Sequence, residues 1–286
     1  MLKHRNISFI GAGSMAEAMI SGLINKAGIS PERITAANHS NVERRSELIN
    51  KYDIQAVSFN ELSLKNTDVI ILAVKPKQAE EVLQQLKTNL QDHHVILSVL
   101  AGISTPFIEE IIGKHLPVIR VMPNTSSMIG ESITGISAGK YVKNEDLDLA
   151  QELSKAIGKV KIISEKQMDV FTGIAGSGPA YFYYLLEHME DVAVENGLDR
   201  EMARDIAAQT LYGASKMVME SDDSPAELRK KVTSPNGTTA AGLDALDENG
   251  GGKAIEAAVE NAAERSKTLR KEFEKVPVLY VVFGSC

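Results

Sequence analysis

Gly11, Gly13 and Ala16 follow the apolar run of residues 7–10 with the spacing Gly-x-Gly-x-x-Ala. Gly11 permits a tight turn out of a buried strand, and Gly13 removes a side chain where a ligand must approach the backbone. Ala16 is small enough for the next helix to pack on the strand, and the N-terminus of that helix offers free N–H groups to an anion. This pattern favours the pyrophosphate of a dinucleotide, and a turn with only a structural role is the alternative.

A second group of small and hydroxyl-bearing residues lies at positions 234–239, where the sequence is Ser-Pro-Asn-Gly-Thr-Thr before a helical pattern. The hydroxyls, together with backbone N–H groups at the start of the helix, form a neutral cradle for a small carboxylate. Residues 176–179, Gly-Ser-Gly-Pro, also place proline in the first turn of a helix and leave N–H groups for an anion. Simple helix capping is the alternative for both segments.

The residues that follow the second predicted strand indicate which dinucleotide the glycine turn would hold. A site specific for NAD has a carboxylate there, about 20 residues beyond the glycines, that binds the ribose 2′-hydroxyl. This chain has no carboxylate at that place. Instead, Asn38 and Ser40 can donate to a 2′-phosphate, and Arg44 and Arg45 can neutralise it. We therefore expect NADPH to be preferred, with NADH as a weaker cofactor, unless the arginines only form a solvated helical turn.

An alternation of strands and helices must hold these segments in the first part of the chain. Short apolar runs predict strands, and the amphipathic patterns between them predict helices, which is typical of β-α-β units and a parallel sheet. Beyond about residue 164 the strand-like runs end and long helical patterns follow. We expect an α/β protein with a Rossmann-like doubly wound sheet in residues 1–164 and an all-helical dimerisation domain in residues 165–286. The predicted strands are residues 6–10, 34–37, 69–73, 95–99, 118–122 and 159–163, and the predicted helices are residues 15–26, 42–51, 78–90, 106–112, 145–157, 180–196, 200–220, 225–232, 237–247 and 253–274.

The composition narrows the range of partners. The chain has 31 Lys and Arg against 38 Asp and Glu, and the net charge of −7 argues against nucleic acid or an anionic membrane. No stretch approaches the ~20 apolar residues of a membrane span, and we expect no signal peptide. Cys286 is the single cysteine, so no intramolecular disulfide or thiolate cluster can form, and we expect no metal site. A reducing, cytoplasmic setting fits this cysteine usage.

Four further segments, taken with the glycine turn, resemble the pyrroline-5-carboxylate reductase family over nearly the whole chain. They are Ala73-Val74-Lys75-Pro76, Ser98 to Gly102, Gly176 to Tyr181 and Thr233 to Thr239, and the last two are specific to that family in this combination. The resemblance implies hydride transfer from NADPH to the C=N carbon of a cyclic imino acid, which gives L-proline. It also implies a homodimer formed through the helical domain, with a ring of dimers as a larger option.

The resemblance places Thr239 beside the ring nitrogen of the substrate and assigns the substrate carboxylate to the same turn. We therefore expect Thr239 and Ser234 to be catalytic residues. Lys75 could instead be a solvated loop residue, and turn chemistry explains Asn124 as well as a contact to the nicotinamide carboxamide does. The expected substrate-binding residues are Glu165, Gly178, Ser234, Gly237, Thr238 and Thr239, and the expected cofactor-binding residues are Gly11, Ala12, Gly13, Ser14, Met15, Asn38, Ser40, Arg44, Asn60, Val74, Lys75, Pro76, Ala101 and Asn124.

Two rival functions remain open at this point. A β-hydroxyacid dehydrogenase has a similar pair of domains and uses a lysine in the long interdomain helix, but residues 179–196 contain no lysine. A regulator that binds NADPH without catalysis is the second alternative. Lys231 stands where some relatives have a neutral amide, and it could contact the cofactor or point to solvent. The apolar segment 276–283 also departs from the family, and it either packs on a partner subunit or promotes aggregation.

Overall fold

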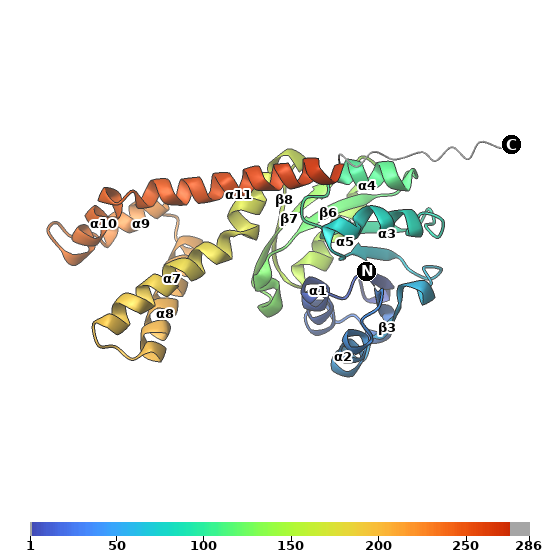
Figure 1. The fold of residues 1–286 in the computed structure, drawn as a ribbon, viewed down its shortest axis with the longest axis horizontal. Helices are drawn as coiled ribbons and strands as arrows, with labels where there is room; N and C mark the ends of the chain where they lie inside the picture. The colour runs from blue at the N-terminus through green and yellow to red at the C-terminus, as the bar shows by residue number, and fades with distance from the viewer. Residues whose placement is uncertain (1, 275–286) are drawn as a thin grey trace. The chain divides into compact units, whose positions relative to one another are not determined.

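One eight-stranded sheet organises the first part of this computed structural model, which describes residues 2–274 (Figure 1). The strand order is β3-β2-β1-β4-β5-β6-β7-β8, and all neighbouring strands are parallel except β6 and β7. The chain thus extends the sheet in both directions from β1, which is the doubly wound topology predicted from the sequence. The strands are β1 Ile7–Ile10, β2 Ile34–Asn38, β3 Gln55–Ser58, β4 Val69–Leu72, β5 Val95–Ser98, β6 Val118–Met122, β7 Ser132–Ala138 and β8 Gly158–Ile162.

The six predicted strands are all present, each within one residue of its expected ends. The sequence pattern does not predict β3 and β7. β3 is a four-residue edge strand that has no continuous apolar run. β7 buries the hydroxyl residues Ser132, Thr134 and Ser137 beside the aliphatic Ile136, so its sequence lacks the continuous apolar run of a buried strand.

Helices cover both faces of the sheet and complete two separate apolar cores. Because strand residues alternate between faces, Phe9 shares one core with Met19, whereas Ile10 shares the other with Leu83. Each fully buried side chain of this kind contributes roughly 1.5–3 kcal/mol. The first face is covered by α1 Ser14–Asn25, α2 Val42–Tyr52 and α5 Asn144–Lys155, and the second by α3 Ala79–Leu86 and α4 Thr105–Ile112.

The end of α3 is where the helix predictions differ most from the structure. The helix stops at Leu86, although the apolar pattern predicts it to residue 90. Thr88 and Asn89 are poor helix formers, and the Asn89 N–H bonds back to the Leu86 carbonyl at 2.8 Å. Leu90 is nevertheless buried. Its apolar side chain therefore continued the helical apolar pattern in the sequence, although the helix itself ends earlier.

Long helices make up the remainder of the described chain, as predicted. α7 Gly178–Glu195 is followed by α8 Arg200–Glu220, whose N-cap Asp199 accepts from two backbone N–H groups of its first turn. The other elements are α6 Met168–Phe171, a π-helical turn at Thr172–Gly176, α9 Pro225–Lys231, α10 Thr238–Glu248 and α11 Gly251–Glu274. No helix within residues 2–274 is both long and apolar enough to cross a membrane.

The chain divides into two compact units, and their limits differ from the expected boundary after residue 164. Within the described residues, the first unit contains the sheet, continues through Gly176 and also includes residues 261–274, while the second unit is Ser177–Glu260. The predicted boundary was placed where the sequence changes from strand patterns to helix patterns. The compact units are instead defined by which residues pack against one another in space. The apolar segment 276–283 lies outside the described residues.

Contacts of Asp169 explain why the segment after residue 164 belongs to the sheet-bearing unit. Its carboxylate pairs with Arg270 at 3.0 Å and accepts from the Ser266 hydroxyl at 2.8 Å, both on the last turns of α11. Its neighbour Met168 is fully buried. The end of α11 is fastened at Ser104 as well, whose hydroxyl donates to Glu274 at 2.5 Å.

Candidate active site

A groove with a volume of about 520 Å³ lies at the carboxyl ends of β1, β2 and β4. Its walls come from the glycine turn after β1, the loop after β2 and the segment from Ala73 to Lys75 after β4. The sheet extends in opposite directions from β1, so the groove occupies the topological switch point where doubly wound sheets bind ligands.

The glycine turn has the geometry that an approaching anion requires. Gly11 has a φ of +115°, and a Cβ there would lie 2.3 Å from the carbonyl oxygen of Ala73, so only glycine fits. Gly13 is the N-cap of α1, and a Cβ at Gly13 would meet nothing within 4 Å. The backbone N–H groups at the start of α1 therefore face open space without a side-chain cap.

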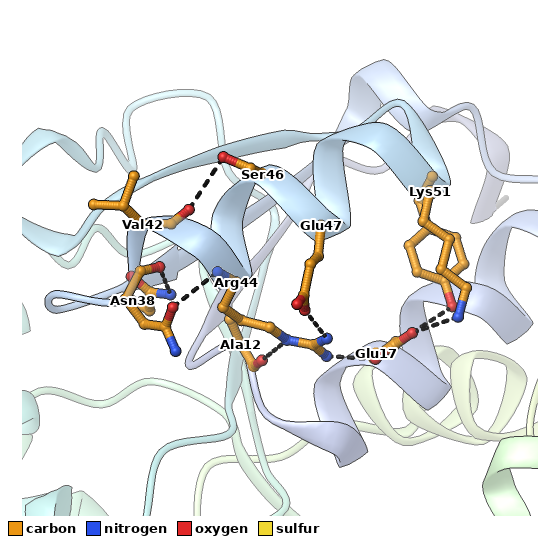
Figure 2. A network of polar contacts seen from close by, with 10 residues as sticks. Ala12, Glu17, Asn38, Val42, Arg44, Ser46, Glu47 and Lys51 are labelled. Carbon is orange, nitrogen blue, oxygen red and sulfur yellow. Dashed lines mark hydrogen bonds and ion pairs between the residues drawn. The ribbon is translucent and has the colours of Figure 1, made fainter.

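Arg44 connects the glycine turn to α2 at one wall of the groove (Figure 2). Its Nε donates to the carbonyl oxygen of Ala12 at 2.8 Å, and its Nη1 donates to Glu47 at 2.9 Å. Its Nη2 forms an ion pair with Glu17 on α1. Burial lowers the pKa of Arg44, but these two carboxylates outweigh that effect, and the net shift is upward. The arginine is therefore firmly held and fully charged.

Glu17 lies at the centre of this cluster, and the sequence pattern did not single it out. Its side chain is 11% exposed, and its Oε1 accepts from Lys51 at 2.8 Å and from the Tyr52 hydroxyl at 3.0 Å. The hydrogen bond from Lys51 is the main cause that lowers the pKa of Glu17 to about 2, with Arg44 contributing as well. Only the packing of α1 against α2 brings these groups together, so a local motif could not have revealed them.

Asn38 and Ser40 both line the groove, and the Asn38 side chain is also bonded within the fold. The Asn38 amide donates to the Asn41 carbonyl at 2.9 Å, and its oxygen accepts from Arg45 at 2.7 Å. Ser40 is exposed at the groove. Arg45 is therefore committed to Asn38 and does not line the groove.

The remaining cofactor candidates separate into two groups by position. Val74 and the exposed Lys75 line the groove together with the residues described above, whereas Asn60 is exposed on the neighbouring 3₁₀ turn and is not part of the wall. Asn124 is buried, and its side chain bonds within the fold to Ser126 and Ala175. The candidates on the groove wall are Gly11, Ala12, Gly13, Asn38, Ser40, Arg44, Val74 and Lys75, and those off it are Ser14, Met15, Asn60, Pro76, Ala101 and Asn124.

Glu165, expected to bind substrate, makes an ion pair with an arginine that the sequence pattern did not point to. Arg120 lies on β6, is 1% exposed, and donates from Nη1 to Glu165 at 2.6 Å. Among the described residues, Arg120 Nε and Nη2 and Glu165 Oε2 are buried without a hydrogen-bond partner. The carboxylate of Glu165 therefore compensates the buried positive charge of Arg120 within the unit that contains the sheet.

The hydroxyl-rich turn of the second unit is open. Gly237 is the N-cap of α10 and gives no side-chain cap, while its own N–H bonds to the Ser234 carbonyl at 3.0 Å. The hydroxyls of Ser234, Thr238 and Thr239 are exposed and donate to no other residue within 2–274. These side chains do not serve as helix caps, which was the alternative to ligand binding.

Two other predicted features of the second unit are placed by their contacts. Gly178 begins α7 and is buried, with Ser177 as an N-cap that makes no side-chain bond to the helix. Lys231 pairs with Asp223 at 2.5 Å, so its charge is compensated within this unit. The two alternatives for Lys231 were contact with the cofactor and exposure to solvent. Its side chain is 65% exposed.

Comparison with known proteins links both units to one enzyme. A family model described as pyrroline-5-carboxylate reductase dimerisation matches residues 165–269, and one described as NADP oxidoreductase, coenzyme F420-dependent, matches residues 6–102. Pyrroline-5-carboxylate reductase 1 of Bacillus spizizenii is 54% identical over 271 residues, which are 95% of this chain and 91% of the relative.

The crystal structure of Plasmodium falciparum pyrroline carboxylate reductase with NADP bound has 32% identity and a TM-score of 0.85, covering 94% of this chain and 99% of that one. The Coxiella burnetii enzyme has 34% identity and a TM-score of 0.84, covering 93% and 98%.

Proposed function

This chain belongs to the pyrroline-5-carboxylate reductase family, and from that premise we propose that it reduces 1-pyrroline-5-carboxylate to L-proline with a nicotinamide dinucleotide. The main support is the identity of 54% across nearly all of the chain to a relative of that name. The groove at the switch point of the sheet supports the same conclusion, because its glycine turn fits a pyrophosphate.

We infer that NADPH is the preferred cofactor and that NADH is used less well. The loop after β2 presents Ser40 to the groove without a carboxylate, and the guanidinium of Arg44 lines the same wall. The NADP-bound relative and the NADP oxidoreductase family model are consistent with this choice. Phe59 and Val82 give the groove an apolar side that suits an adenine ring.

In this proposal, residues of the chain bind the cofactor and the substrate and hold them in position for hydride transfer. The N–H groups at the start of α1 bind the pyrophosphate, and the bound nicotinamide supplies the hydride for the imine carbon. The free hydroxyls of Ser234, Thr238 and Thr239, with the N–H groups that begin α10, bind the substrate carboxylate and ring nitrogen. Thr239 acts as a hydrogen-bond partner that orients the ring nitrogen, because a threonine hydroxyl is too weak an acid to protonate it at neutral pH.

We further propose a homodimer formed through the helical part. α7 and α8 expose many large apolar side chains, as expected for helices that meet a second copy. The family model described as a dimerisation region matches the same part of the chain. Light scattering of the purified protein distinguishes this dimer from a ring of dimers. The exposed side chains include Phe182, Tyr183, Leu185, Met202, Ile206 and Tyr212.

Oxidation of NADPH in the presence of 1-pyrroline-5-carboxylate tests the proposal, with NADH compared under the same conditions. Thr239→Ala is expected to lower kcat by about tenfold or more while the KM for NADPH stays nearly constant, because a hydrogen bond to a charged group contributes about 1.5–3 kcal/mol. Thr88→Ala is the matched control, since Thr88 is exposed in the loop after α3.

The rival functions predict different results in the same assay. Faster oxidation of 3-hydroxy acids than reduction of the imine would favour a β-hydroxyacid dehydrogenase. NADPH binding without turnover of either substrate would favour a non-catalytic regulator. Absence of cofactor oxidation with both NADPH and NADH would refute the proposed reductase activity.

A further inference from the structure

Arg44 separates the cofactor groove from a second hollow that contains its charged partners. Glu17, Glu47 and Lys51 line this second hollow and are absent from the groove wall, whereas Arg44 lines both. The four side chains are joined by ion pairs of Glu17 with Arg44 and Lys51, and of Glu47 with Arg44. Two cations and two carboxylates give this cluster no net charge.

Arg44 still has donors for a ligand in the groove. One N–H on each of Nε, Nη1 and Nη2 is used by Ala12, Glu47 and Glu17, which leaves one N–H on each terminal nitrogen. A phosphate beside the groove wall can therefore bind Arg44 without breaking the bonds that hold the side chain. Such a phosphate must nevertheless share the positive charge with the two carboxylates.

Glu17 is the stronger of these two competitors. Its side chain is 11% exposed, whereas the side chain of Glu47 is 63% exposed and its charge is weakened by solvent. Lys51 and Tyr52 donate to Glu17 and keep its carboxyl ionised at neutral pH. Glu17 therefore carries a full negative charge directly behind the arginine of the groove wall.

We propose that Glu17 is a positioning residue that sets how strongly the enzyme prefers NADPH over NADH. It fixes the Arg44 guanidinium at the groove wall and at the same time offsets its charge, which limits the advantage of a cofactor with a 2′-phosphate. NADH, which has a 2′-hydroxyl, does not interact with this charge to the same degree. This inference rests on the proposed function, because it assumes that a nicotinamide dinucleotide occupies the groove.

Two substitutions are expected to move the preference in opposite directions. Glu17→Gln keeps the size of the side chain and removes its charge, so the ratio of Kd for NADH to Kd for NADPH should rise about fivefold. Lys51→Met removes the second cation that pairs with Glu17. The negative charge of Glu17 then offsets the positive charge of Arg44 more completely, and the ratio should fall about twofold. The side chain of Lys51 is 62% exposed, so this variant is expected to fold normally.

Calorimetric titration of the purified protein with NADPH and with NADH measures these ratios directly, and kcat/KM for each cofactor gives a second readout. Glu43→Gln is the matched control, because it removes the same charge from an exposed position on α2 outside both hollows. The ratio should remain as in the wild type for this control. Thermal unfolding of every variant establishes that the compared proteins are folded.

The outcomes separate a specificity role from a structural one. If Glu17 serves only to stabilise the fold, Glu17→Gln weakens both cofactors equally and the ratio does not change, which overturns the proposal. If Glu17→Gln fails to fold, the Lys51→Met ratio decides: a fall supports the proposal and an unchanged ratio overturns it. Binding of both cofactors without reduction of pyrroline-5-carboxylate would instead refute the proposed function and leave the measured ratios valid.

Discussion

Replacing Glu165 by glutamine tests whether this residue chiefly compensates a buried arginine. Arg120 is 1% exposed and its one hydrogen-bonded partner among the described side chains is Glu165, at 2.6 Å. Removing one partner of a buried ion pair costs about 3–5 kcal/mol, because the other charge is left uncompensated. Since the side chain of Glu165 is 21% exposed, we expect a smaller loss of about 2–3 kcal/mol in the free energy of unfolding.

Scanning calorimetry of the purified protein measures this loss. For a chain of this size each kcal/mol lowers Tm by about 2–4 °C, so Glu165→Gln should lower Tm by about 4–12 °C. The control is Glu145→Gln, whose carboxylate is 78% exposed and lies 3.8 Å from Lys143. Exposed pairs of this kind contribute at most about 1 kcal/mol, so the control should leave Tm nearly unchanged.

A second variant distinguishes loss of a charge partner from general damage to the fold. Arg120 Nε and Nη2 are already buried without partners, so an apolar side chain of similar length suits the site at least as well once Glu165 is neutral. Arg120→Met combined with Glu165→Gln should therefore recover much of the lost stability. A Tm for Glu165→Gln within about 1 °C of the wild type, or a double variant less stable than Glu165→Gln alone, would refute this reasoning.

Two further results are expected from the glycine turn and from pH. Gly11→Ala should raise the Kd for NADPH about tenfold and lower Tm, because its φ is +115° and the added Cβ would lie 2.3 Å from the Ala73 carbonyl oxygen. Gly13→Ala, whose Cβ would meet nothing within 4 Å, should weaken binding alone, and equal losses of Tm in calorimetry would contradict this difference. The pKa of Glu17 is lowered from 4.5 to about 2, mainly by Lys51, so the stability it contributes is complete above pH 4.5 and is lost as the pH falls toward 2. The Tm difference between the wild type and Glu17→Gln should shrink over that range, and a constant difference would exclude this linkage.

The fold was predictable wherever one element carries its own pattern. Strands such as Val69–Leu72 are continuous apolar runs because both of their faces are covered by helices. β7 was not predictable, because several of its buried positions hold small hydroxyl residues, such as Ser132 and Thr134 where it pairs with β8. The division into compact units was also beyond local patterns, since Asp169 and Arg270 are paired across about a hundred residues of chain.

The site shows the same contrast between local geometry and tertiary contact. Gly11 is required by its own backbone conformation, which is why the spacing of the glycines located the groove. The pairing of Arg120 with Glu165 joins β6 to a turn 45 residues later, and no motif in either segment announces it. In the sequence, the amide side chain of Asn124 suggests a contact with a ligand. In the structure, that amide forms hydrogen bonds with the backbone of Ser126 and of Ala175.

The proposed role of Glu17 in the choice of cofactor concerns a carboxylate that lies outside the segment after β2 in the linear sequence. The segment after β2 lacks the acidic residue of NAD-specific sites, and this absence alone favours NADPH. Glu17 nevertheless brings a carboxylate to the same corner from α1, with Arg44 between it and the groove. Under the proposal, Arg44 would meet a 2′-phosphate with its charge already partly offset, and the electrostatic preference for NADPH would be smaller than an unpaired arginine gives. Affinity for the two cofactors should consequently differ less than the missing acid by itself implies.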